Sequence, residues 1–221
     1  MFDRVLITSG PTVEPIDPVR YISNRSSGKT GFHIANEAKK RNISEIIFIT
    51  GPTCYLPSEV RCIKVETAME MRARVFENIE NVSVVIMVAA VSDYKTPTYF
   101  PHKIKKNSEK MTLELEKNPD ILLEIGIKKK DNQILVGFAA ETENIFENGK
   151  RKLAEKNMDL LVLNEISKSN PGFNVDTNEV YFLTPGEIKK LPRMNKSDIA
   201  VNVWDKIFDI ARDKKIYERQ F

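Results

Sequence analysis

Short, nearly continuous apolar runs recur along the chain, and segments with helical periodicity separate several of them. Runs of this kind, rich in β-branched residues, are typical of strands that are covered on both faces of a parallel sheet. Alternation of such strands with helices predicts a doubly wound α/β fold with a mainly parallel sheet. The runs cover residues 4–9, 46–50, 82–90, 133–140 and 160–163.

Helices are expected between these strands, and their starts are marked by capping residues. Small polar side chains satisfy the free N–H groups of a first helical turn, and a proline is tolerated there. The last helix also has an apolar face of period 3.6, from Ile199 to Ile210. The expected capping residues are Thr67 (with Glu70), Asn118 (with Pro119 and Asp120), Thr142 and Ser197.

One segment breaks the alternation of strands and helices. Residues 111–116 read M-T-L-E-L-E, and this strict alternation predicts a half-exposed strand that pairs with the chain before it. The result would be a β-hairpin flap over about residues 95–117, inserted in the α/β core as a lid or a dimer arm. Residues 168–177 have the turn chemistry of a loop. No linker or repeat is visible, so residues 1–221 are predicted to form one domain.

Composition narrows the class of protein. Lys and Arg number 34 against 31 Asp and Glu, and this mild excess argues against a dedicated nucleic-acid binder. No apolar run reaches the length of a membrane span, and the N-terminus lacks a signal peptide. Two cysteines, Cys54 and Cys62, are too few for a disulfide framework. These features predict a soluble cytoplasmic protein.

The stretch S-N-R-S-S-G-K-T-G, from Ser23 to Gly31, resembles a P-loop but fails on two counts. Ser23 occupies the position of the first glycine, and Pro15 and Pro18 exclude the buried strand that must precede a P-loop. The stretch is instead interpreted as a polar loop that leads into a helix N-terminus, where exposed N–H groups favour an anion. The side chains assigned to this loop are those of Arg20, Asn24, Ser26, Ser27 and Lys29.

Ligands of open α/β sheets bind at the carboxyl ends of the strands, so the residues that follow each strand are the next candidates. Gly10 follows the first run, Ala89, Ala90 and Asp93 follow the third, and Phe138 lies near the end of the fourth. Each alone is a weak signal, because a phenylalanine in a strand is more often core and an aspartate is as often a turn cap. Their shared placement at one edge favours a ligand site.

Lysines add positive charge near the same edge. Lys103, Lys105 and Lys106 lie in the flap, and Lys152 and Lys156 are four apart on a helix and share a face. Solvated surface charge is the alternative interpretation for both groups. No nucleophilic triad is visible around either histidine, so transfer at a phosphate is favoured, where positioning and charge neutralisation dominate.

Several motifs occur together and in order. They are G-P-T-V-E-P-I-D-P-V-R-Y-I-S-N-R-S-S-G-K-T-G, A-A-V-S-D-Y, K-I-K-K, K-N-P-D-I-L and G-F-A-A-E-T. In these motifs, over nearly its whole length, the chain resembles phosphopantothenate–cysteine ligase, the synthetase half of the bacterial bifunctional coenzyme A biosynthesis protein. Val13 and Thr30 depart from residues common in the family, and neither has an assigned role. The resemblance implies a Rossmann-like fold.

The resemblance also implies a reaction. The carboxylate of 4′-phosphopantothenate attacks the α-phosphate of CTP, and cysteine then displaces CMP to form an amide. Asn24 would hold the intermediate, Arg20 would shape the same loop, Lys103 would bind nucleotide phosphate, and Lys106 belongs to the same motif. The implied nucleotide site comprises Gly10, Ser26, Ser27, Ala89, Ala90, Asp93, Lys103, Pro119, Asp120, Ile121, Leu122, Phe138, Lys152 and Lys156.

Further partners follow from the same resemblance. A divalent cation, Mg²⁺ or Mn²⁺, would bridge phosphates; its ligands stay open, with Asp93 as a candidate. The protein would form a homodimer, with a flavin-dependent decarboxylase on a separate or fused chain. An NAD(P) oxidoreductase is disfavoured, because G-x-G-x-x-G is missing after the first strand. ATP in place of CTP, and a nucleotide sensor without turnover, are the alternatives kept open.

Overall fold

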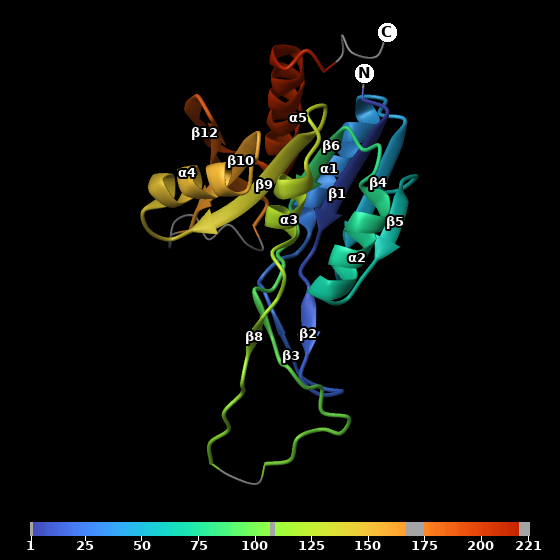
Figure 1. Cartoon of the computed structure of the whole chain (residues 1–221), viewed down its shortest axis with the longest axis vertical. Helices are drawn as coiled ribbons and strands as arrows, with labels where there is room; N and C mark the ends of the chain where they lie inside the picture. Colours follow the sequence, from blue (N-terminus) through green and yellow to red (C-terminus); the bar gives the residue numbers. More distant parts are fainter. Residues whose placement is uncertain (1, 107–108, 167–174, 217–221) are drawn as a thin grey trace.

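The structure is a computed structural model that describes residues 2–106, 109–166 and 175–216 (Figure 1). Within them, eight strands form one central sheet in the order β12-β11-β10-β9-β6-β1-β4-β5. These strands are β1 (Arg4–Ser9), β4 (Glu45–Thr50), β5 (Arg61–Lys64), β6 (Val84–Met87), β9 (Ile134–Glu141), β10 (Leu160–Glu165), β11 (Thr177–Thr184) and β12 (Glu187–Asn195).

Six of these strands form the parallel part of the sheet, from β5 through β4, β1, β6 and β9 to β10. Numbered along the chain, their spatial order is 3-2-1-4-5-6, the order of doubly wound dinucleotide-type folds. The predicted fold class is therefore confirmed. The strand order reverses between β1 and β6, and this is the point at which such sheets bind ligands.

Helices cover both faces of the sheet and bury its apolar side chains. The helices α1 (Lys29–Lys40) and α5 (Lys196–Asp213) pack on one face, around the fully buried Trp204. On the other face lie α2 (Ala68–Asn78), α3 (Ile121–Lys128) and α4 (Ile145–Glu155). This three-layer arrangement explains why the strands have continuous apolar runs: both of their faces are covered.

The predicted helix starts are right at one place and wrong at three. Thr67 caps α2 by accepting a hydrogen bond from the N–H of Glu70 at 3.1 Å, as predicted. In α3 the cap is Asp120, whose carboxylate accepts from Leu123 N–H at 3.0 Å, while the side chain of the expected cap, Asn118, donates to Ser92 O. The N-caps of α4 and α5 are Asn144 and Asn195 in place of the expected Thr142 and Ser197.

The strand predictions miss β5 and the antiparallel pair β11–β12, which extends the sheet beyond β10. The run at residues 82–90 yields a strand of only four residues, because the chain after Met87 turns toward the ligand edge. Of the loop predicted at residues 168–177, residues 168–174 lie outside the described part, and Thr177 already belongs to β11.

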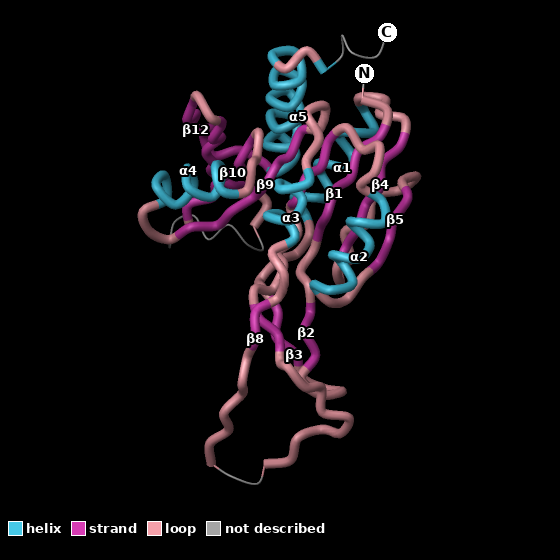
Figure 2. The backbone as a smooth tube through the Cα atoms, in the orientation of Figure 1, coloured by secondary structure: helices cyan, strands magenta, loops and turns pink. Residues whose placement is uncertain are grey.

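An arm projects from the carboxyl edge of the sheet, away from the two ends of the chain (Figure 1). It contains the ribbon of β2 (Val13–Pro15) and β3 (Tyr21–Ser23), and a second ribbon of β7 (Tyr94–Lys95) and β8 (Glu116–Lys117). The rest of the arm is loop (Figure 2). The predicted strand at residues 111–116 is wrong except for its last residue, because two lone strands without a covering layer are marginally stable.

In the part of the chain that the structure describes, no helix has both the length and the apolar character needed to cross a membrane. Both cysteines are exposed and unbridged.

Candidate functional site

A cavity of about 590 Å³ lies where β1 and β6 end, at the reversal of the strand order. The two strand ends are joined by backbone hydrogen bonds, from Ala90 N–H to Gly10 O at 2.9 Å and from Thr12 N–H to Ala90 O at 3.1 Å. These bonds fix the floor of the cavity. Gly10 has a φ of 69°, and an added Cβ would lie 3.0 Å from Gly51 O, so this position requires glycine.

One wall of the cavity is the loop that enters α1. Gly28 is the N-cap with a φ of 79°, and its carbonyl oxygen accepts a hydrogen bond from Ser9 Oγ at 3.1 Å. Asn24 donates from Nδ2 to the carbonyl of Val91 at 2.9 Å, which ties this loop to the segment after β6. The predicted polar loop at a helix start is therefore present, with Ser26 and Ser27 on the cavity surface.

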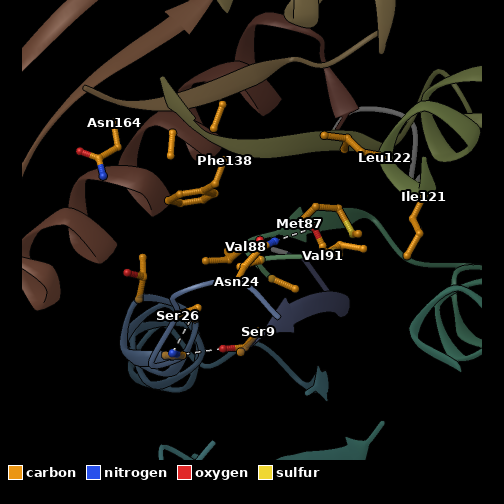
Figure 3. Close-up of a pocket in the computed structure, with 18 of the residues that line it drawn as sticks. Ser9, Asn24, Ser26, Met87, Val88, Val91, Ile121, Leu122, Phe138 and Asn164 are labelled. Atoms are coloured by element: carbon orange, nitrogen blue, oxygen red, sulfur yellow. Dashed lines mark hydrogen bonds between the residues drawn. The ribbon is translucent and has the colours of Figure 1, made fainter. Parts of the chain in front are cut away.

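The opposite wall comes from β9, β10, α3 and α4. Figure 3 shows Phe138 and Asn164 on the far side of the cavity from Ser9 and Ser26. Lys152 pairs with Glu141 at 2.5 Å, and Lys156 pairs with Asp120 at 2.7 Å. The two lysines therefore line the cavity in ion pairs, where a ligand hydroxyl or phosphate can compete for them.

A basic cluster lies at the N-terminus of α1. Lys29 pairs with Asp176 at 2.5 Å, and this hydrogen bond raises the pKa of Lys29. Lys196 is 4% exposed, and burial together with the charge of Lys29 lowers its pKa. The pKa of His33 is lowered by burial and by the same two lysines. This end of the cavity therefore has a positive potential suited to an anionic group.

Fourteen of the predicted site residues line this one cavity. They are Gly10, Asn24, Ser26, Ser27, Ala89, Ala90, Asp93, Pro119, Asp120, Ile121, Leu122, Phe138, Lys152 and Lys156. Three do not line it: Arg20, Lys103 and Lys106 belong to the arm, and both lysines are exposed there. Period-two alternation would place Lys103 and Lys105 on one face of a strand and Lys106 on the other, but the chain forms no strand at these residues.

Sequence reasoning missed Lys196, Asn178 and Asn164, which also line the cavity. Asn178 lies in β11, where buried and less buried residues alternate, so a search for period two at residues 177–184 could have found the strand. Lys196 is the first residue of α5, one position before the expected cap.

Two polar atoms beside the cavity lack a hydrogen-bond partner among the described residues. They are Ser92 Oγ and Asn118 Oδ1, both buried. The amide nitrogen of Asn118 does have a partner, because Nδ2 donates to Ser92 O at 2.9 Å. A buried polar atom costs free energy when it has no partner, so Ser92 Oγ and Asn118 Oδ1 are positions where a bound ligand or water would supply a hydrogen bond.

The described residues contain no group of three or more His, Cys, Asp or Glu side chains placed to hold a metal ion. A dedicated metal centre built from protein ligands alone therefore does not fit this part of the chain. Mg²⁺ commonly binds through one or two carboxylates together with substrate phosphates, and a single carboxylate such as Asp93 is compatible with that mode.

The fold and this site define a family. Residues 2–210 match the family described as DNA/pantothenate metabolism flavoprotein C-terminal domain, and the chain belongs to that family. The coenzyme A biosynthesis bifunctional protein CoaBC of Bacillus subtilis (strain 168) is 42% identical over 212 residues, which are 95% of this chain and 52% of the relative. CoaBC of Escherichia coli (strain K12) is 40% identical over 208 residues, 92% of this chain and 51% of the relative.

The chain thus spans about half the length of the curated relatives that it matches. A crystal structure of the C-terminal domain of CoaBC superposes with a TM-score of 0.78 at 38% identity, and the match covers 96% of each chain. The resemblance predicted from the motifs is confirmed at the level of the family and the fold.

Proposed function

We propose that this chain joins 4′-phosphopantothenate to cysteine at the expense of a nucleoside triphosphate, as a phosphopantothenate–cysteine ligase of coenzyme A biosynthesis. The observation that carries the proposal is the gathering of fourteen predicted site residues, twelve of them from the motifs, around one cavity at the reversal of strand order. The names of the relatives, which are coenzyme A biosynthesis proteins, support the same substrate class.

The first step activates the substrate carboxylate. One carboxylate oxygen bonds to the α-phosphorus of CTP, the bond to the β-phosphate bridging oxygen breaks, and pyrophosphate leaves. Asn24 is assigned to the acyl-cytidylate that results. Its Nδ2 is held by Val91 O in the free protein, so the amide is already oriented at the cavity edge before substrate arrives.

In the second step the cysteine amine attacks the acyl carbon, CMP leaves, and the amine loses a proton as the amide forms. The basic wall of Lys29, Lys152, Lys156 and Lys196 would hold the anionic groups during both steps. Lys103 is assigned to the triphosphate and Lys106 to the second step. A divalent cation, Mg²⁺ or Mn²⁺, would neutralise phosphate charge, and it would enter with the nucleotide because the described residues form no metal centre of their own.

CTP is proposed over ATP because the motif set resembles that of the bacterial members of the family. Ala89 and Ala90 leave room for a flat base of either kind, and backbone groups from Met87 to Ala90 would distinguish the base edge. The product retains the cysteine carboxylate, so a flavin-dependent decarboxylase, fused or separate, is the partner proposed to consume it.

We also propose a homodimer that forms through the arm. Many of the large exposed apolar side chains of the described residues lie on its two ribbons and the loops that join them, and exposed apolar side chains that gather in one region are typical of an interaction surface. They are Val19, Tyr21, Tyr94, Tyr99, Phe100, Met111 and Leu115. The same arm carries Lys103, which leaves open whether it serves its own cavity or the cavity of the second subunit.

The decisive assay measures pyrophosphate release from the purified protein with Mg²⁺, cysteine and 4′-phosphopantothenate, and compares CTP with ATP. Release that requires phosphopantothenate, faster with CTP, is expected, and mass spectrometry should detect phosphopantothenoylcysteine. Nucleotide binding without any release would point to the sensor alternative, and faster release with ATP would reverse the choice of nucleotide.

Mixing two variants of strongly reduced activity distinguishes the two placements of Lys103. Asn24→Asp and Lys103→Gln subunits are unfolded together, refolded and assayed. If Lys103 acts on the cavity of the partner, mixed dimers contain one intact site and regain activity. If Lys103 acts within its own subunit, each subunit of a mixed dimer keeps one defect and no activity returns.

A further inference from the structure

Asp17 lies in the turn between β2 and β3 and organises the arm around it. Its carboxylate is buried, and Oδ1 accepts hydrogen bonds from the N–H groups of Val19 at 2.8 Å and Arg20 at 2.9 Å. Its other oxygen, Oδ2, reaches across to the second segment of the arm and accepts from Ile104 N–H at 3.1 Å. One side chain thus joins two segments that are 87 residues apart in sequence.

Arg20 completes the grip on Ile104. Its Nη2 lies 3.0 Å from Asp17 Oδ2 and donates to the carbonyl of Ile104 at 2.5 Å. Both polar groups of Ile104 are therefore held by the Asp17–Arg20 pair. Ile104 stands between Lys103 and Lys105, which are exposed. The Asp17–Arg20 pair therefore fixes the backbone from which these two lysine side chains project.

Two further hydrogen bonds, nearer the base of the arm, also join its two segments. Thr96 Oγ1 donates to Pro15 O at 3.2 Å, and Phe100 N–H donates to Ile16 O at 2.9 Å. The chain here forms no strand, so the segment is positioned by individual hydrogen bonds. Burial raises the pKa of Asp17, but the N–H groups of Val19, Ile104 and Arg20 outweigh it and keep the pKa below its ordinary value of 3.8. The carboxylate is therefore charged at neutral pH.

We propose that Asp17 is a positioning residue for the ligation: together with Arg20 it holds the backbone N–H and C=O of Ile104, and it thereby places Lys103 for contact with the phosphates of the nucleotide. The proposal rests on the proposed function for the role of Lys103. We name the contact of Asp17 and Arg20 with Ile104 the clamp. Arg20 is assigned to it because its guanidinium contacts Asp17 and Ile104 and does not line the cavity.

Limited trypsin digestion tests the clamp without reference to activity. Trypsin cuts after lysine, and Lys103, Lys105 and Lys106 flank the clamped residue. The variant Asp17→Asn keeps the shape of the side chain but loses its charge, so we expect cleavage at these lysines to rise about tenfold. Arg20→Gln removes the guanidinium that donates to the carbonyl of Ile104 and leaves the bonds after Lys103, Lys105 and Lys106 open to trypsin, so it should also raise cleavage there if Asp17→Asn fails to fold.

The matched control is Asp159→Asn, at a buried aspartate on the far side of the molecule. Asp159 accepts from Leu135 N–H at 2.8 Å and pairs with Lys129 and Lys214. This variant should lower thermal stability and leave cleavage at residues 103–106 at the wild-type rate. Equal cleavage in Asp17→Asn and Asp159→Asn would overturn the clamp.

A double-mutant cycle tests the link to Lys103. Asp17→Asn should slow pyrophosphate release about tenfold or more in the wild-type background and have no further effect in the Lys103→Gln background. Equal slowing in both backgrounds would show that Asp17 does not act through Lys103, and would overturn the proposal. A wild-type protein that releases no pyrophosphate would refute the proposed function instead, while the digestion would still decide whether the clamp exists.

Discussion

The sheet and the arm are built by opposite means, although they belong to one chain and meet at one cavity. In the sheet, six parallel strands bury apolar side chains on both faces and pair along continuous ladders. In the arm, two short ribbons and a few single hydrogen bonds hold long loops, and large apolar side chains face solvent. Rigidity is thus concentrated where the nucleotide is proposed to bind.

The difference suggests that the sheet and the arm have separate roles in binding and in the reaction. The cavity wall holds its polar groups in place before ligand arrives, which lowers the entropic cost of binding. The arm holds charged side chains away from that wall, where they can be brought to a phosphate by movement of the arm or by a second subunit. The following changes test whether the two regions are as separate as this comparison claims.

The largest expected effect on stability comes from the core. Trp204 is fully buried, and its Nε1 donates to Ile34 O at 3.0 Å. Trp204→Ala should lower the free energy of unfolding by about 3–5 kcal/mol in a urea titration. Tyr99→Ala, in the arm, should leave it within about 0.5 kcal/mol at concentrations where the protein is monomeric. A comparable loss from Tyr99→Ala would place the arm inside the cooperative core.

The largest expected effect on rate comes from the arm. Lys103→Gln should reduce pyrophosphate release by about 10²–10³-fold, because it removes a charge that stabilises the transferring phosphate. Its urea midpoint should be unchanged, since Lys103 is exposed. Normal activity of this variant would show that Lys103 is a solvated surface charge, and the arm would then have no demonstrated role in the reaction.

A smaller effect separates two serines at the cavity. Ser9 Oγ donates to Gly28 O, so Ser9→Ala should lower stability by about 1 kcal/mol. Ser92 Oγ is buried without a partner among the described residues, so Ser92→Ala should leave stability equal or slightly higher. Thermal unfolding of the two variants side by side measures the difference. Destabilisation by Ser92→Ala as large as that of Ser9→Ala would contradict this account.

The smallest effect depends on pH and concerns the link between α2 and α3. Arg72 donates to both oxygens of Glu124, at 2.8 and 2.7 Å, and this hydrogen bonding lowers the pKa of Glu124 from 4.5. The pair therefore adds stability above pH 4.5 that disappears as pH falls through the lowered pKa. Arg72→Gln should cost about 0.5–1 kcal/mol at pH 7, because both side chains are partly exposed, and the cost should shrink as pH falls through the lowered pKa to what the contact of Arg72 with the Phe76 ring contributes. A cost that stays constant as pH falls would exclude the ion pair as its cause.

The comparison also explains what could be predicted from the sequence. The order of the central strands and of the helices between them followed from apolar runs and helical periodicity, because burial on both faces leaves a strong pattern. The residues at the strand ends could be named for the same reason, since connectivity alone brings Gly10, Ala89 and Phe138 to one edge. The edge strands β5 and β12, and β11 beside β12, were missed because partly exposed strands lack a continuous apolar run.

The placement of the arm could not be predicted. Its path depends on single hydrogen bonds, such as that from Ile104 to Asp17, between residues far apart in sequence. Alternation at residues 111–116 therefore suggested a strand that has no sheet to join. Lys196 was missed because its burial in the cavity depends on the hairpin β11–β12 that precedes it.

The most direct test of the account is a single-turnover experiment without cysteine, in which Asn24→Asp and wild-type protein are mixed with CTP, Mg²⁺ and 4′-phosphopantothenate and quenched. The account predicts one pyrophosphate and one phosphopantothenoyl-cytidylate per active site, with the adduct detected by mass spectrometry. When cysteine is added, the wild-type protein should consume this adduct, and Asn24→Asp should consume it more slowly. Pyrophosphate release without an acyl-nucleotide adduct, or no release from wild type, would contradict it.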